Sequence, residues 1–124
     1  MTVAFWCVLV AAVLPYLATS IAKVGGERFN NRDPRAWLDR QQGLRRRAHN
    51  AQLNSFEAFP FFAAAVIIAH LAHAPQGRVD AVAIVFVVAR LAYLVCYLGN
   101  WHWIRSLVWL VGWLASLTIF LLAA

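Results

Sequence analysis

The sequence predicts an all-α integral membrane protein built as a single four-helix bundle. Of its 124 residues, 63% are hydrophobic and only 13% are charged, far from the balance of a water-soluble domain. Four apolar segments are each long enough to cross a hydrocarbon core of about 30 Å. Because a segment in lipid must satisfy its backbone groups internally, we expect all four to be helices.

The first apolar segment predicts a helix over residues 2–24. It lacks a basic N-terminal region and is longer than the apolar part of a signal peptide, so we expect a retained span. Residues 25–44 combine Gly, Pro, Asn and charged side chains and predict one long loop. The other segments predict helices over residues 45–73, 79–98 and 102–123, joined by short turns.

Positive charge is concentrated at one end of the predicted bundle. Eight of the eleven Lys and Arg residues lie between Lys23 and Arg47. The positive-inside rule therefore predicts cytoplasmic first and third loops, with both termini outside. Cations confined beside a membrane favour orientation and lipid contact over nucleic-acid binding. The sequence has no CxxC and no Cys/His cluster, so we expect no metal site.

Two ionisable residues, Glu57 and Arg90, interrupt the apolar segments. Charged side chains inside a span are costly and are functional candidates by default. Helical spacing gathers further side chains beside each of them. The stripe of Glu57 also holds Asn50, Asn54 and Phe61, and the stripe of Arg90 also holds Tyr93 and Tyr97.

Glu57 and Arg90 are expected at the same depth. Glu57 follows Arg47 by ten residues, and Arg90 precedes Gly99 by nine. At about 1.5 Å per residue, both lie roughly 15 Å from the basic end of their helices. This allows either an ion pair that pins two helices together or a polar ligand shared by both. The pattern alone leaves both open, although the surplus of polar groups favours a pocket open to the cytoplasm.

Arg105 opens the last helix at the same membrane face. An arginine there can simply extend its charged end to the interface. It can also face a ligand held between helices, and a cation near a thiol favours the nucleophilic thiolate.

Three short stretches together resemble the MAPEG family, the membrane-associated proteins in eicosanoid and glutathione metabolism. "AQLNSFEAFPFF" (51–62) is similar to the family signature Asn-x-x-Glu-x-x-Pro-Phe. "ARLAYLVCYLG" (89–99) is similar to the pattern of the third helix, and "IRS" (104–106) to the start of the fourth. The resemblance spans the whole chain and is to a bacterial-type member of the family, similar to microsomal glutathione transferases.

The resemblance implies a homotrimer in a bacterial inner membrane, with glutathione as co-substrate between neighbouring subunits near the cytoplasmic face. It implies that Asn54 and Glu57 hold the tripeptide and that Arg105 stabilises its thiolate. Arg90, Tyr93 and Tyr97 would line the same site. Lys23 would reach the ligand of a neighbour.

One position departs from the family pattern. Relatives that use glutathione usually carry an arginine four residues before the signature asparagine, where this chain has Asn50. Arg47, about one helical turn earlier, is the predicted substitute. If Arg47 does not take this role, the site binds a carboxylate more weakly and glutathione is less favoured as its ligand.

Three functions follow from these patterns. The first is a glutathione or related thiol transferase or peroxidase that acts on lipophilic electrophiles or lipid hydroperoxides entering from the bilayer. The alternative is a non-catalytic trimer that binds a lipid or another anionic ligand in the same pocket. A four-span drug–proton exchanger would use Glu57, but such proteins usually carry their glutamate in the first helix.

Overall fold

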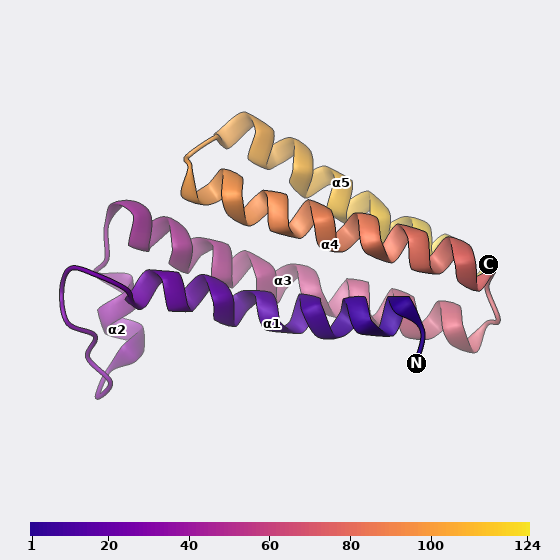
Figure 1. Ribbon diagram of the computed structural model, residues 1–124, viewed down its shortest axis with the longest axis horizontal. Coiled ribbons are helices and arrows are strands. Elements are labelled where there is room, and N and C mark those ends of the chain that lie inside the picture. The colour runs from indigo at the N-terminus through magenta and orange to yellow at the C-terminus, as the bar shows by residue number, and fades with distance from the viewer.

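The computed structural model describes residues 1–124 and contains five helices and no strand (Figure 1). The all-α class is confirmed. Four long helices, whose ends lie within three residues of the predicted ones, are α1 (Val3–Lys23), α3 (Gly43–Leu71), α4 (Gln76–Leu98) and α5 (His102–Leu121). A short helix, α2 (Pro34–Asp39), lies in the first connection.

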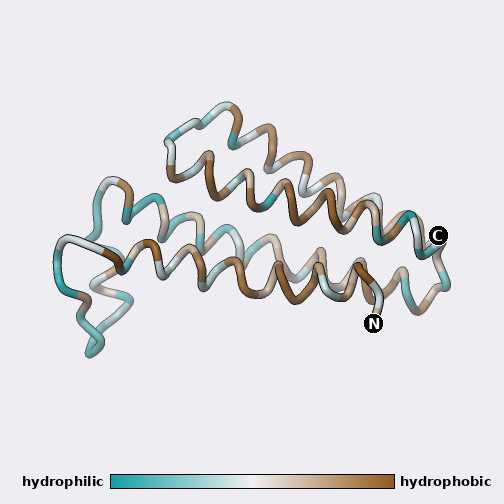
Figure 2. Tube along the Cα trace, viewed as in Figure 1, coloured by the Kyte–Doolittle hydropathy of each residue, from teal (hydrophilic) through white to brown (hydrophobic).

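The long helices present apolar side chains to their surroundings. Their most apolar 18-residue windows have mean hydropathies between 1.4 and 2.3, yet no more than 39% of any window is buried. Figure 2 shows the hydrophobic colour along the helices and the hydrophilic colour mainly at the two ends of the bundle, with its longest stretch in the first connection. Faces of this kind need lipid or another apolar surface, so the chain is an integral, multi-pass membrane protein.

The helices form two antiparallel pairs, α1 with α3 and α4 with α5 (Figure 1). The termini and the α3–α4 turn lie at one end of the bundle. The first connection, α2 and the α4–α5 turn lie at the other, which we call the basic end because it holds the cations between Lys23 and Arg47.

Small side chains bring the helices close together. Four alanines along one face of α1 are no more than 4% exposed, and such residues allow close packing in membranes. At the centre, the ring of Phe62 stacks on Phe86, with ring centroids 3.8 Å apart. The alanines are Ala4, Ala11, Ala18 and Ala22.

Asp80 of α4 accepts a hydrogen bond from the start of α1. Its Oδ1 accepts the backbone N–H of Ala4 at 2.8 Å and the side-chain amide of Gln76 at 2.7 Å. The first N–H groups of a helix have no partner within the helix and favour a negative charge. Asp80 satisfies one of them from another helix.

The prediction of one long loop over residues 25–44 was wrong in part, because α2 forms within it. Asp33 accepts the N–H of Ala36 and is followed by Pro34, a favourable start for a helix. Trp37 is fully buried, and its Nε1–H donates to the carbonyl of Arg28 at 2.9 Å. The first connection is therefore anchored against the ends of α1 and α3.

Three consecutive arginines, Arg45, Arg46 and Arg47, form what we call the arginine triplet. Each donates to the carbonyl at the C-terminal end of a different helix, where backbone acceptors lack partners. The acceptors are the carbonyls of Val24 after α1 (3.3 Å), Asp39 in α2 (2.8 Å) and Leu98 in α4 (3.2 Å). The arginine triplet thus links the start of α3 by hydrogen bonds to the C-terminal ends of α1, α2 and α4.

Candidate functional site

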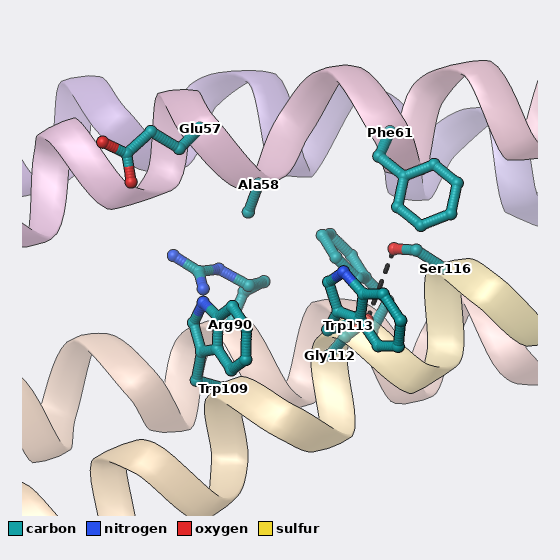
Figure 3. A pocket seen from close by; sticks show the side chains of 9 residues that line it. Glu57, Ala58, Phe61, Arg90, Trp109, Gly112, Trp113 and Ser116 are labelled. Atoms are coloured by element: carbon teal, nitrogen blue, oxygen red, sulfur yellow. Dashed lines mark hydrogen bonds between the residues drawn. The ribbon is translucent and has the colours of Figure 1, made fainter.

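A pocket of about 140 Å³ opens between α3 and the α4–α5 pair (Figure 3). It lies midway along the helices and is walled by aromatic, small and charged side chains. Its lining residues are Glu57, Ala58, Phe61, Phe86, Arg90, Trp109, Gly112, Trp113 and Ser116.

Glu57 and Arg90 carry opposite charges into this pocket without pairing. Figure 3 shows both side chains at the same end of the gap, with Phe61 and Ser116 at the other end. The chain's salt bridges are Arg40 with Glu27 and His49 with Asp39, so no ion pair joins Glu57 to Arg90. The equal depth expected from the sequence therefore does not produce the direct ion pair that would pin the two helices.

Arg90 is 3% exposed and is held by neutral groups. Its Nη2–H donates to Oγ of Ser55 at 3.4 Å, and its Cζ lies 4.2 Å from the ring centroid of Tyr93. The Ser55 hydroxyl donates in turn to the carbonyl of Ala51 at 2.8 Å. These contacts fix the guanidinium but leave its charge without a carboxylate partner in the chain.

A row of two arginines and two tyrosines extends from the pocket towards the basic end. The rings of Tyr93 and Tyr97 meet edge to face, with centroids 5.6 Å apart. The guanidinium of Arg105 lies over Tyr97, 4.4 Å from its centroid. The structure therefore brings Arg90, Tyr93, Tyr97 and Arg105 into one continuous row across α4 and α5.

Asn54 extends the site along α3. Its side-chain amide donates to Oε2 of Glu57 at 3.4 Å. Its Oδ1 is buried and has no hydrogen-bond partner in the chain. An unpaired buried acceptor costs about 1–3 kcal/mol, so a donor from outside the chain would be stabilised there.

The other three predicted site residues lie apart from the pocket. The Nε–H of Arg47 donates to the carbonyl of Leu98, so that nitrogen is not free for a ligand. Asn50 is half-buried and makes no side-chain hydrogen bond within the chain. Lys23, at the end of α1, lies over the ring of Phe29 at 4.3 Å.

Sequence reasoning missed the α5 side of the pocket. Trp109 and Trp113 follow helical spacing and lie deep in a span, although tryptophan in membrane proteins favours the interface. That displacement is the signal that could have found them. Ser116 gave no signal, because a serine that bonds back to its own helix, here to Gly112 at 3.3 Å, is common in spans.

The titratable side chains do not cluster as metal ligands. No group of three or more His, Cys, Asp and Glu residues is placed to hold a metal ion.

Fold and site together define a class: a multi-pass helical membrane protein with an unpaired carboxylate and guanidinium facing one pocket. The family model of the MAPEG family matches residues 3–124, and the chain belongs to this family of membrane proteins, which is associated with glutathione and eicosanoid metabolism. No curated protein and no solved structure matches the chain.

Proposed function

We propose that the protein is a membrane-embedded thiol transferase or peroxidase that binds glutathione, or a related thiol, and acts on lipophilic electrophiles or lipid hydroperoxides. One observation carries the proposal: Glu57 and the buried Arg90 line one pocket without neutralising each other. A buried charge is costly unless it is paired. A ligand with both an ammonium and a carboxylate, such as the γ-glutamyl end of glutathione, supplies both partners.

The pocket of one chain is too small to enclose a tripeptide. Its volume of about 140 Å³ is below the range of about 300–1,000 Å³ that ligand sites usually have. Glu57 is also exposed on the outer face of α3. Both features support a homotrimer in which a neighbouring subunit completes the site, with Lys23 of that neighbour as a further cation.

Arg105 would act on the thiol. A guanidinium beside a thiol stabilises the thiolate, and the released proton goes to water. In conjugation, the thiolate attacks an electrophilic carbon, a C–S bond forms, and the leaving group departs with its electron pair. In hydroperoxide reduction, the sulfur takes the terminal oxygen as the O–O bond breaks, which leaves an alcohol. A second thiol then converts the sulfenic acid to a disulfide and water.

A conjugation assay tests this proposal. Purified protein is given glutathione and a chromogenic halonitroarene, and the wild type is compared with Arg105→Ala. We expect the variant to lose about a hundredfold in kcat, the lower end of what removing one positioned electrostatic donor usually costs. Arg78→Ala is the matched control, because Arg78 is an exposed arginine at the opposite end of α4. Equal rates in wild type and Arg105→Ala would refute the role of Arg105.

A non-catalytic binding protein is the second candidate. Asn50 favours it, because this position lacks the cation that glutathione-using relatives carry, and Arg47 donates to Leu98. In that case the same pocket holds a lipid or another anion. Native mass spectrometry that finds a lipid lost in Glu57→Gln, together with no conjugation, would replace the first proposal with this one.

A further inference from the structure

A second and larger cavity lies outside the candidate site, at the basic end of the molecule. It has a volume of about 420 Å³ and is formed between α2 and the outer face of the first half of α3. Its lining residues are Arg35, Leu38, Asp39, His49, Gln52, Leu53 and Phe56. Its volume falls within the range of small-molecule sites.

The polar wall of the cavity is built around a buried histidine. His49 is 8% exposed; its Nε2 lies 3.5 Å from Oδ1 of Asp39, and its Nδ1 lies 3.3 Å from Oε1 of Gln52. Asp39 itself keeps 69% of its side chain exposed. Arg35 makes no hydrogen bond or ion pair within the chain. The wall therefore presents a free cation and a reachable carboxylate.

The lining changes from polar to apolar with depth. Along α3, His49 and Gln52 are followed by Leu53 and Phe56, which are 48% and 42% exposed. From His49 to Phe56 the helix advances roughly 10 Å at about 1.5 Å per residue. That length spans the headgroup region of one leaflet and reaches the first acyl carbons.

This stripe of α3 is separate from the candidate site. At about 3.6 residues per turn, the stripe through His49, Leu53 and Phe56 lies roughly a third of a turn from the stripe through Asn54 and Glu57. The third face of the helix is buried against the other helices and includes Ala48, Ala51, Ser55 and Phe62. The helix thus has two outward faces that can bind different molecules.

We propose that the cavity binds one phospholipid with an ethanolamine headgroup. Its phosphate would pair with Arg35, and its ammonium would donate to Asp39 and Gln52, while the acyl chains would run along Leu53 and Phe56. A purely anionic headgroup would meet the Asp39 carboxylate, which repels it. A choline headgroup cannot donate hydrogen bonds and is usually bound by an aromatic cage, which the polar wall lacks.

Native mass spectrometry on delipidated protein tests the proposal. Three synthetic lipids with identical acyl chains are titrated, one each with an ethanolamine, glycerol or choline phosphate headgroup. We expect one ethanolamine lipid per chain, bound about tenfold more tightly than the other two. Arg35→Ala and Asp39→Asn should each weaken it about tenfold, the size of one charge-assisted hydrogen bond.

Matched controls separate this site from general charge and from the candidate site. Arg32→Ala removes an exposed arginine of the same connection that does not line the cavity, and Glu27→Gln removes an exposed carboxylate. Both should bind as the wild type does, as should Glu57→Gln. Soluble glycerophosphoethanolamine should not bind, because it lacks acyl chains.

Three outcomes would overturn the proposal. The first is equal binding of all three lipids. The second is loss of binding in Arg32→Ala as large as in Arg35→Ala, which would mean general attraction to a basic surface. The third is loss of the lipid in Glu57→Gln, which would place it in the pocket between α3, α4 and α5.

Discussion

Arg90 is the only buried guanidinium of the chain, and its surroundings explain how a membrane protein tolerates it. The guanidinium donates to Ser55 and lies over the ring of Tyr93, while Glu57 stays out of ion-pair distance. The contact with Ser55 makes that serine a positioning residue for the guanidinium. Its importance can be tested without changing any charge.

Ser55→Ala should weaken glutathione binding about fivefold, because the guanidinium loses an acceptor worth about 1 kcal/mol and becomes less fixed. Binding is measured by isothermal titration. Ser20→Ala is the control, since Ser20 makes the same bond to the carbonyl four residues earlier (2.8 Å) but is exposed on α1. An unchanged affinity in Ser55→Ala would show that this serine does not position Arg90.

The family resemblance predicts an arginine at the position where this chain has Asn50. Asn50→Arg should therefore tighten glutathione about tenfold through one added charge-assisted hydrogen bond. Gln42→Arg adds the same charge at the same end of α3 but before the stripe of Asn54, and should have little effect. If both variants tighten binding equally, the gain comes from net charge and not from position 50.

At the residue scale, helical spacing and depth predicted which charged side chains line one pocket. They did not predict whether those side chains form an ion pair. The periodicity of α3 and α4 placed Glu57 and Arg90 at one level, and both line the pocket. Whether they touch depends on the separation of the helices and on rotamers. Ser55 could not be found from periodicity, because it lies on the buried face of α3.

The arginine triplet is the main feature at the scale of elements. From sequence, Arg45, Arg46 and Arg47 are an orientation signal, which depends only on their charge. In the structure each also satisfies carbonyls at the end of a different helix. Charge patterning could not reveal these acceptors, because they come from distant parts of the chain. The helix α2 was missed for a related reason, since its six residues are too few to show periodicity.

Arg47→Ala should destabilise the protein by about 1 kcal/mol, because the C-terminal carbonyl of α4 loses a charged donor that is only partly exposed. The melting temperature in detergent should fall by a few degrees. Arg32→Ala is the control, because the side chain of Arg32 is exposed and makes no hydrogen bond. An unchanged melting temperature in Arg47→Ala would show that the bond to Leu98 contributes no stability.

At the scale of the whole molecule, the charge asymmetry predicts which end of the bundle faces the cytoplasm. Asn31→Cys, in the first connection, should react with a membrane-impermeant thiol reagent only in inside-out vesicles. Gly77→Cys, at the opposite end, should react only in right-side-out vesicles; a side chain there has open space around it. The native Cys7 and Cys96 are buried and should not react with the reagent. The reverse pattern would contradict the predicted orientation.

The proposal that a neighbouring subunit completes the site also belongs to the scale of the whole molecule. The pocket between α3 and the α4–α5 pair is small, Glu57 is exposed, and the buried Oδ1 of Asn54 has no partner in the chain. The four spans and the basic end follow from composition and charge alone. The surface that completes the site could not be predicted from the periodicity of a single chain, because a neighbouring subunit would supply it.

Isothermal titration of glutathione into the detergent-purified protein tests the central claim most directly. We expect saturable heat at millimolar or lower ligand, with affinity at least about tenfold weaker in Glu57→Gln, which removes the charge without changing the shape. Glu27→Gln, an exposed carboxylate of the first connection, should bind as the wild type does. No heat from the intact, folded protein at millimolar glutathione, or equal heat in wild type and Glu57→Gln, would contradict the account.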